Sequence, residues 1–243
     1  MKILILGGTG EARELAARLV ELGHDVTTSL AGRTKSPELP AGQLRVGKFG
    51  GILGLVGYLQ QRGFDRLVDA THPYAGLISI NAVAAAERTG IPLVRYVRPA
   101  WPEPYGANWQ HVASIGAAAE ALPPGAVALV TTGHEGLERL LERNDCTLLV
   151  RLIEPPAHPL PRHAKLVLSR PPYSLEQERG LMQREAVTHL VSKNSGGEQT
   201  RAKLAAAQAL SVKVVMVERP VYGPAVEVAT LDAAIAALHL DAS

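Results

Sequence analysis

The sequence predicts an α/β fold of two domains with mainly parallel sheets, and three observations lead to this. Short apolar runs, of a length suited to buried parallel strands, alternate along the chain with segments of helical spacing. The first run, residues 3–6, is followed at once by a glycine turn and a helix. With 243 residues, the chain can form one large or two small domains with cores of their own.

The first strand, turn and helix form a predicted phosphate site. Gly-Gly-Thr-Gly at residues 7–10 follows the strand, and residues 11–22 place leucines on one helix face. A helix N-terminus has N–H groups without partners in the helix and about half a positive charge, so it stabilises a bound phosphate. An ordinary tight turn is the alternative, because Gly-Gly-x-Gly is shorter than the full dinucleotide-binding pattern.

The second strand, residues 25–30, indicates which dinucleotide binds. In this architecture the end of the second strand faces the adenosine ribose, and an acidic residue there binds a free 2′-hydroxyl. This chain has Ser29 at that end, then Arg33 and Lys35, and no acidic residue from 26 to 37. A guanidinium and hydroxyls suit a phosphate monoester, so NADPH is favoured over NADH. A solvated basic loop is the alternative.

The alternation continues through the rest of the chain. We expect further strands at 44–46, 66–70, 92–96, 110–113, 126–131, 147–153, 165–169, 189–192 and 213–217. We expect further helices at 52–61, 74–89, 115–122, 134–142, 174–185, 198–210 and 231–238. Residues 97–109 collect prolines, a glycine and two tryptophans. They mark the crossing between domains, which we place at 1–104 and 105–243.

Composition excludes several classes of function. The formal net charge is +2, which implies no strong field for nucleic acid or a membrane surface. The single cysteine, Cys146, cannot form a disulfide within the chain, and no apolar span is long enough to cross a bilayer. A cytoplasmic protein is therefore expected. No set of His, Cys, Asp and Glu has metal-ligand spacing, so no metal is expected.

The loops at the carboxyl ends of the strands are rich in polar residues, and in a parallel sheet such loops line one crevice. Thr71 and His72 follow the strand at 66–70, where they cap a helix, contact a cofactor, or do both. The segment around Lys193 repeats the strand–glycine–helix pattern of an anion site. Arginines at strand ends suit bound anions, and solvated surface arginines are the alternative; they are Arg95, Arg98, Arg151 and Arg170.

Seven segments together resemble the precorrin-6A reductase family of cobalamin biosynthesis. They are GGTGEARELA, TSLAGR, VGKFGG, DATHPYA, VRPAW, TTG and SKNSGG, and the resemblance extends from residue 2 to about 220. Lys48 and His134 depart from the expected pattern, which affects loop details. The resemblance implies two Rossmann-like three-layer α/β/α domains, with NADPH and substrate in a cleft between them.

The resemblance also implies the reaction and its residues. It implies reduction of precorrin-6A to precorrin-6B with NADPH, by hydride transfer to the C18=C19 double bond of a polycarboxylate tetrapyrrole. The candidate proton donors are His72, Tyr74 and Lys193, with bulk water as a fourth. The expected cofactor contacts are Gly7, Gly8, Thr9, Gly10, Glu11, Ser29, Arg33, Thr71 and His72. The expected substrate contacts are Arg98, Arg151, Arg170, Lys193, Asn194, Ser195 and Gly196.

Three other functions stay open at this point. A cobalt-precorrin-6A reductase would act on the cobalt-containing macrocycle, and a non-catalytic NADP(H)-binding regulatory module would bind without turnover. A nucleotide-phosphate hydrolase or transferase would need a pair of carboxylates, for which only Glu11 and Asp69 are candidates. A short-chain dehydrogenase is excluded, because no tyrosine has a lysine four residues later. A monomer that contacts neighbouring pathway enzymes transiently is compatible with the sequence.

Overall fold

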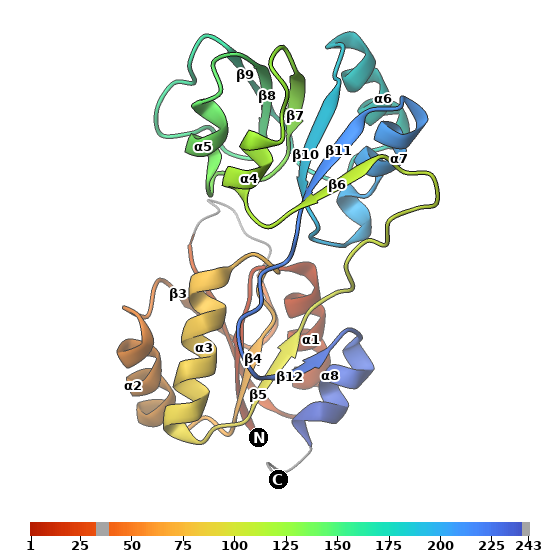
Figure 1. Ribbon diagram of the computed structural model, residues 1–243. Helices are drawn as coiled ribbons and strands as arrows, with labels where there is room; N and C mark the ends of the chain where they lie inside the picture. The colour runs from red at the N-terminus through yellow and green to blue at the C-terminus, as the bar shows by residue number, and fades with distance from the viewer. Residues whose placement is uncertain (33–38, 240–243) are drawn as a thin grey trace. The chain divides into compact units, whose positions relative to one another are not determined.

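The computed structural model describes residues 1–32 and 39–239. It divides the chain into two compact units, of which the first is Met1–Pro99 with Pro220–Ser243 and the second is Ala100–Arg219. Each unit contains one six-stranded sheet in which all the paired strands are parallel, with helices on both faces (Figure 1). The α/β fold of two parallel-sheet domains is thereby confirmed.

The first unit has the strand order β3-β2-β1-β4-β5-β12, which is the order of a dinucleotide-binding Rossmann sheet. Its strands are β1 (Lys2–Leu6), β2 (Asp25–Leu30), β3 (Gln43–Val46), β4 (Arg66–Asp69), β5 (Leu93–Tyr96) and β12 (Val226–Val228). Its helices are α1 (Gly10–Glu21), α2 (Ile52–Arg62), α3 (Gly76–Thr89) and α8 (Leu231–Leu238). The order reverses between β1 and β4, so the loops after these two strands form the switch point at which such sheets bind ligands.

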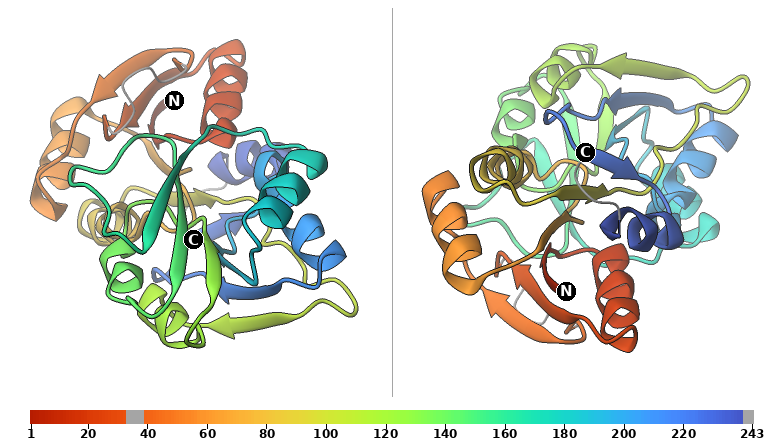
Figure 2. Two further views of the ribbon diagram at one scale, coloured as in Figure 1. Left: turned by 90° about the horizontal axis from the view of Figure 1, so that it is seen from above. Right: turned by 90° about the horizontal axis from the view of Figure 1, so that it is seen from below.

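Alternate side chains of the buried strand β1 serve two cores. Ile3 and Ile5 pack with α1 and α8 on one face, and Leu4 and Leu6 pack with α2 and α3 on the other. Residues 3–6 of the strand are therefore all apolar, as expected for a parallel strand covered on both sides. The views along the sheet show α8 (blue) beside α1 (red), and α2 and α3 (orange and yellow) across the strands (Figure 2).

The second unit has the order β9-β8-β7-β10-β11-β6, with its switch point between β7 and β10. Its strands are β6 (Trp109–Val112), β7 (Val127–Val130), β8 (Thr147–Leu152), β9 (Ala164–Leu168), β10 (His189–Lys193) and β11 (Lys213–Val217). Its helices are α4 (Ile115–Glu120), α5 (Leu137–Leu141), α6 (Leu175–Arg184) and α7 (Ala202–Ala209). A 3₁₀ turn, η1 (Glu198–Thr200), precedes α7, so the helix expected at 198–210 starts as a tighter turn.

The chain returns to the first unit after Arg219, which differs from the expected boundaries. Residues 105–243 were expected to form the second domain, but β12 pairs with β5 through Val226 and Val94, and α8 packs on α1. The first sheet thus receives its sixth strand from the segment that follows the second unit, whereas the second sheet is built from six consecutive strands of one continuous segment. The sequence did not predict β12, because three residues with a central glutamate carry no apolar run.

A buried ion pair lies in the second unit. Arg151 of β8 contacts Glu178 of α6 through both nitrogens of its fork, at 2.6 and 3.0 Å, and the two side chains are 8% and 1% exposed. The guanidinium also lies 4.5 Å from the centre of the Tyr173 ring. Arg151 was expected to bind a substrate carboxylate. In the structure its fork contacts a carboxylate of its own core.

Lys203 of α7 is buried beside this pair, with 4% of its surface exposed. Its ammonium donates to Oγ1 of Thr131 at 3.2 Å and lies 5.1 Å from the centre of the Trp101 ring. Burial lowers the pKa of Lys203 to about 7, the charge of Arg151 lowers it as well, and Glu178 acts in the opposite direction.

We expect Lys203 to make the stability depend on pH. Between about pH 7 and the usual lysine pKa of about 10.4, the unfolded chain holds a proton that the folded protein has lost, so the free energy of unfolding rises with pH. The rise is at most about 1.4 kcal/mol per pH unit, and the variant Lys203→Met should lack it. Denaturant unfolding of both proteins at about pH 7 and about pH 9 measures the difference. If the free energies of unfolding of the two proteins differed by the same amount at both pH values, the proposed titration of Lys203 would be contradicted.

No helix among the described residues is both long and apolar enough to cross a membrane.

Candidate functional site

The three glycines of the loop from β1 to α1 differ in whether packing or backbone conformation requires them. A Cβ on Gly7 would meet Cγ2 of Thr28 at 2.8 Å, so a side chain there would clash with β2. Gly8 has a φ of +117°, which a residue with a side chain rarely adopts. Gly10 has neither constraint, since the nearest atom to its Cβ would be Nη2 of Arg13 at 3.9 Å. Neither packing nor backbone geometry therefore requires a glycine at position 10.

Thr9 connects the two loops of the switch point. Its Oγ1 accepts from the amide of Ala12 at 3.1 Å, which makes Thr9 the N-cap of α1, and donates to the carbonyl of Ala70 at 2.8 Å. Both contacts are buried. The expected cofactor role of Thr9 thus falls to its backbone and to the helix end that it caps.

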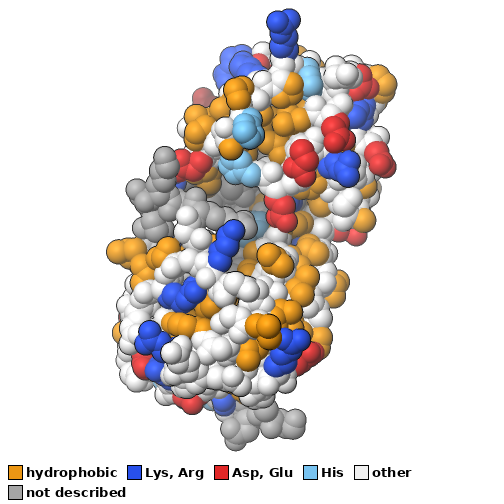
Figure 3. All heavy atoms as spheres, turned by 90° about the vertical axis from the view of Figure 1, so that its left-hand side faces the viewer, with side chains coloured by type: hydrophobic (Ala, Val, Ile, Leu, Met, Phe, Trp, Pro, Cys, Tyr) orange, Lys and Arg blue, Asp and Glu red, His pale blue; other side chains and the backbone are white. Residues whose placement is uncertain are grey.

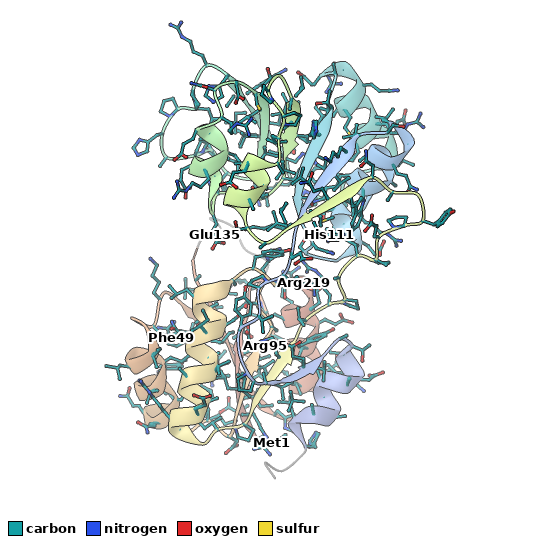
Figure 4. All side chains as sticks on the ribbon, viewed as in Figure 1. Met1, Phe49, Arg95, His111, Glu135 and Arg219 are labelled. Carbon is teal, nitrogen blue, oxygen red and sulfur yellow. The ribbon has the colours of Figure 1, made fainter. Side chains whose placement is uncertain are left out.

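Asp69, at the end of β4, is buried and holds Thr71. Its Oδ1 accepts from the amide of Thr71 at 3.2 Å and from Oγ1 of Thr71 at 2.6 Å. Its Oδ2 lies 3.4 Å from Nε of Arg95 on β5 (Figure 4). Because the Thr71 hydroxyl donates its proton to Asp69, its remaining lone pair presents an acceptor to any ligand.

Arg95 links β5 to the C-terminal segment. Its Nη1 contacts Oε1 of Glu227 on β12 at 2.7 Å and the carbonyl of Gly223 at 3.3 Å. Tyr222, in the same segment, donates to the carbonyl of Pro73 at 2.8 Å. The loop after β4 is therefore held by Asp69, which binds Thr71, and by Tyr222 of the C-terminal segment, which binds the carbonyl of Pro73.

His72 and Tyr74, two candidate proton donors, lie in this loop. His72 is exposed and Tyr74 is 8% exposed. The amide of Tyr74 donates to Nδ1 of His72 at 3.3 Å, so a neutral His72 carries its proton on Nε2. The two rings are 5.8 Å apart. His72 is thus the more accessible of the two groups.

A small hollow in the first unit lies at the carboxyl ends of β1, β4 and β5. It is lined by Thr9, Glu11, Thr71, Pro73, Tyr96, Val97 and Arg98. Nη1 of Arg98 contacts both carboxylate oxygens of Glu11, at 3.1 and 3.0 Å. Partial burial would raise the pKa of Glu11, but the hydrogen bond from its own amide and the Arg98 charge lower it. Burial, with Glu14 and Glu11 nearby, raises the pKa of Tyr96, which keeps that phenol protonated.

The carboxyl ends of β2 and β3 carry a cation that the sequence analysis missed. Ser29 is buried, and Nη1 of Arg45 donates to its Oγ at 3.2 Å. Arg33, expected to bind a 2′-phosphate, lies outside the described residues. Arg45 lies within the short strand β3, whose other residues are exposed, and the sequence offered no pairing that would bring it to Ser29.

Exposed apolar residues occur on α2 and α3 of the same unit. Leu53 and Leu77, in the first turns of these helices, are 76% and 77% exposed. On this face of the first unit, apolar side chains lie between lysines and arginines (Figure 3). The face therefore offers apolar contact area together with positive charge.

In the second unit, the switch point between β7 and β10 is polar. Lys193, at the end of β10, is 9% exposed, and its Nζ lies 3.5 Å from Oε2 of Glu135, in the loop after β7 (Figure 4). The Oγ1 of Thr132 in that loop is buried and has no hydrogen-bond partner among the described residues. Thr132 was not among the expected substrate contacts. Its orphan hydroxyl makes it a candidate for ligand contact.

The remaining expected substrate residues differ in what they can do. Asn194 pairs its carboxamide with the backbone of Trp101, accepting at 2.8 Å and donating at 3.2 Å, so this side chain shapes the loop. Ser195 is 9% exposed, and Gly196 has a φ of +67° in the same turn. Arg170 is exposed and paired with Glu154.

The structure thus brings Glu11, Thr71 and Arg98 together in one hollow of the first unit. Thr132 and Lys193 lie at the carboxyl ends of β7 and β10, which are neighbouring strands of the second sheet. Among the described residues, no group of three or more His, Cys, Asp and Glu side chains could hold a metal ion.

Comparisons with known proteins agree with one another. The family model "Precorrin-6x reductase CbiJ/CobK" matches residues 2–239. A precorrin-6A reductase of Rhodococcus erythropolis is 45% identical over 228 residues, which cover 93% of this chain and 92% of that protein. A cobalt-precorrin-6A reductase of Priestia megaterium is 32% identical over 233 residues, with 90% of each chain covered.

The fold matches a solved structure over almost its whole length. A structure titled "CobK precorrin-6A reductase" superimposes with a TM-score of 0.89 at 37% sequence identity, and the match covers 97% of this chain and 95% of the other. Family model, sequence relatives and fold lead to one assignment. The chain belongs to the precorrin-6x reductase CbiJ/CobK family.

Proposed function

We propose that this protein reduces precorrin-6A to precorrin-6B in cobalamin biosynthesis, with NADPH as the hydride source and the C18=C19 double bond of the macrocycle as the acceptor. The observation that carries the dinucleotide part is Gly10, which neither backbone conformation nor packing requires and which stands at the N-terminus of α1. Membership of the family supports the substrate. The proposal includes that the protein is a monomer and that it works in the cytoplasm.

The residues of the first unit fit a dinucleotide. The N-terminus of α1, with Gly8 and Gly10, would hold the pyrophosphate, and the ends of β2 and β3 would hold the adenosine. The loops at the carboxyl ends of β4 and β5 would face the nicotinamide half, which supplies a hydride when bound. Arg33 remains the predicted 2′-phosphate contact from the sequence.

The chain's own side chains would position groups and move a proton. Thr71, whose hydroxyl proton is donated to Asp69, would accept from a ligand N–H or O–H. His72 is the exposed titratable group of the same loop, and its Nε2 is the atom that would carry a proton outward. Tyr74, Lys193 and water remain alternative donors. The conjugated macrocycle takes up the electron pair, so no strong base is required of the protein.

The second unit would bind carboxylates of the tetrapyrrole. Lys193 supplies a positive charge at the end of β10, and Thr132 and Ser195 supply hydroxyls at the ends of neighbouring strands. Charge-assisted hydrogen bonds of this kind are among the stronger contacts available to a carboxylate. The expected contribution of Arg98 and Arg170 is reduced, since each is paired with a carboxylate of the protein; Lys193 also has such a partner, Glu135, at the longer distance of 3.5 Å.

The activity test is anaerobic mixing of the protein with precorrin-6A and NADPH while the tetrapyrrole spectrum and the NADPH absorbance are recorded. We expect both to change together, with one NADPH oxidised for each macrocycle. NADPH binding without any spectral change would favour the regulatory module. Turnover of cobalt-precorrin-6A alone would favour the cobalt route, although the relatives named for the metal-free substrate include the more similar sequences.

Replacement of Gly10 tests the phosphate site separately from stability. Gly10→Ala adds a methyl group into open space on a helix, so the thermal midpoint should stay unchanged or rise slightly. The same methyl group would stand in the path of the pyrophosphate, and calorimetry should show NADPH binding weakened about 10-fold or more. Gly7→Ala is the contrast, because its clash with Thr28 should lower the midpoint. Undiminished NADPH affinity in Gly10→Ala would argue against the site.

Replacement of Lys193 tests the substrate side. Lys193→Met should raise the KM for precorrin-6A about 10-fold, through loss of one charge-assisted contact, and should leave NADPH affinity unchanged. Lys165→Met is the matched control, because Lys165 is an exposed lysine of the same unit paired with Glu185. A loss of NADPH affinity in Lys193→Met would instead assign Lys193 to the cofactor.

A further inference from the structure

We propose that Arg45 is a specificity-determining residue that recognises the 2′-phosphate of the cofactor's adenosine. The inference rests on the proposed use of NADPH and adds a residue to it. Arg45 lies on β3, directly opposite Ser29 in the parallel register of β2 and β3. In a Rossmann sheet the carboxyl end of β2 is the place that faces the adenosine ribose.

Hydrogen bonds and aromatic rings hold the guanidinium of Arg45 in one orientation. Its Nη1 donates to the carbonyl of Gly47 at 2.6 Å and to Oγ of Ser29 at 3.2 Å, and its Nη2 donates to the carbonyl of Lys48 at 2.9 Å. Its Cζ lies 3.8 Å from the centre of the Phe49 ring and 5.1 Å from the centre of the Tyr58 ring. A fork fixed in this way is preorganised for a further planar contact.

The absence of a carboxylate partner among the described residues distinguishes Arg45 from Arg95 and Arg98 of the same unit. Arg95 is paired with Asp69 and Glu227, and Arg98 is paired with Glu11. Within residues 1–32 and 39–239, no carboxylate forms an ion pair with Arg45, and its acceptors are two carbonyls and a hydroxyl. A fixed cation without a carboxylate partner in the described part of the chain suits an anionic ligand.

Ser29 adds the second element of a phosphate contact. Its Oγ accepts from Arg45, so its own proton can be donated to another acceptor. A phosphate monoester offers only acceptor oxygens. The pair therefore presents a cation and a hydroxyl donor side by side, and a 2′-hydroxyl in place of the phosphate would use the hydroxyl but gain little from the charge.

The test compares two ligands that differ only in the 2′-phosphate, adenosine 2′,5′-bisphosphate and adenosine 5′-monophosphate, by calorimetry on the full chain. Wild-type protein should bind the bisphosphate more tightly. In Arg45→Met the affinity for the bisphosphate should fall about 10- to 100-fold, while that for the monophosphate should change less than about 2-fold. Arg45→Lys keeps the charge without the fork and should lie in between.

Arg66→Met is the matched control, because Arg66 also donates to backbone carbonyls, of Leu238 and Asp65, but lies at the amino end of β4. It should change neither affinity. Equal losses for both ligands in Arg45→Met, or an unchanged preference for the bisphosphate, would overturn the role of Arg45. If wild-type protein itself does not distinguish the two ligands, the proposed NADPH preference fails and the inference with it.

Discussion

The crevice of the first unit depends on the buried contact between Asp69 and Arg95. Asp69 holds Thr71 through two hydrogen bonds, and Arg95 reaches Glu227 on β12. A buried charge without its partner costs on the order of 3–5 kcal/mol, so neither residue is stable in its place alone. The pair therefore couples the shape of the loop after β4 to the strand that completes the sheet.

The glycine turn after β1 and the contact between Asp69 and Arg95 lie on the two sides of the same switch point. Thr9 joins them, because its hydroxyl caps α1 and donates to the carbonyl of Ala70 at the end of β4. The turn leaves no room for a side chain at Gly7, beside Thr28, but it is open at Gly8 and Gly10. Such open positions at a helix N-terminus suit the proposed ligand, which would be bound largely through backbone N–H groups.

The arginines illustrate why charge alone does not identify a binding residue. The sequence places Arg98, Arg151 and Arg170 at strand ends, where bound anions were expected to neutralise them. In the structure each has a carboxylate partner within the protein, and Arg151 is buried with Glu178. Such partners come from elements up to 87 residues away along the chain, a separation that no local pattern reveals.

The sequence by itself determined the alternation of strands and helices, the glycine turn between β1 and α1 and the family resemblance, because apolar periodicity and glycine requirements are local properties. Only the tertiary structure decided that β12 closes the first sheet, that Asn194 serves the backbone of Trp101, and that Arg45 stands opposite Ser29. These depend on strand pairing and on side-chain contacts between distant segments, and hydrogen-bond partners and buried charges are settled only when those segments come together.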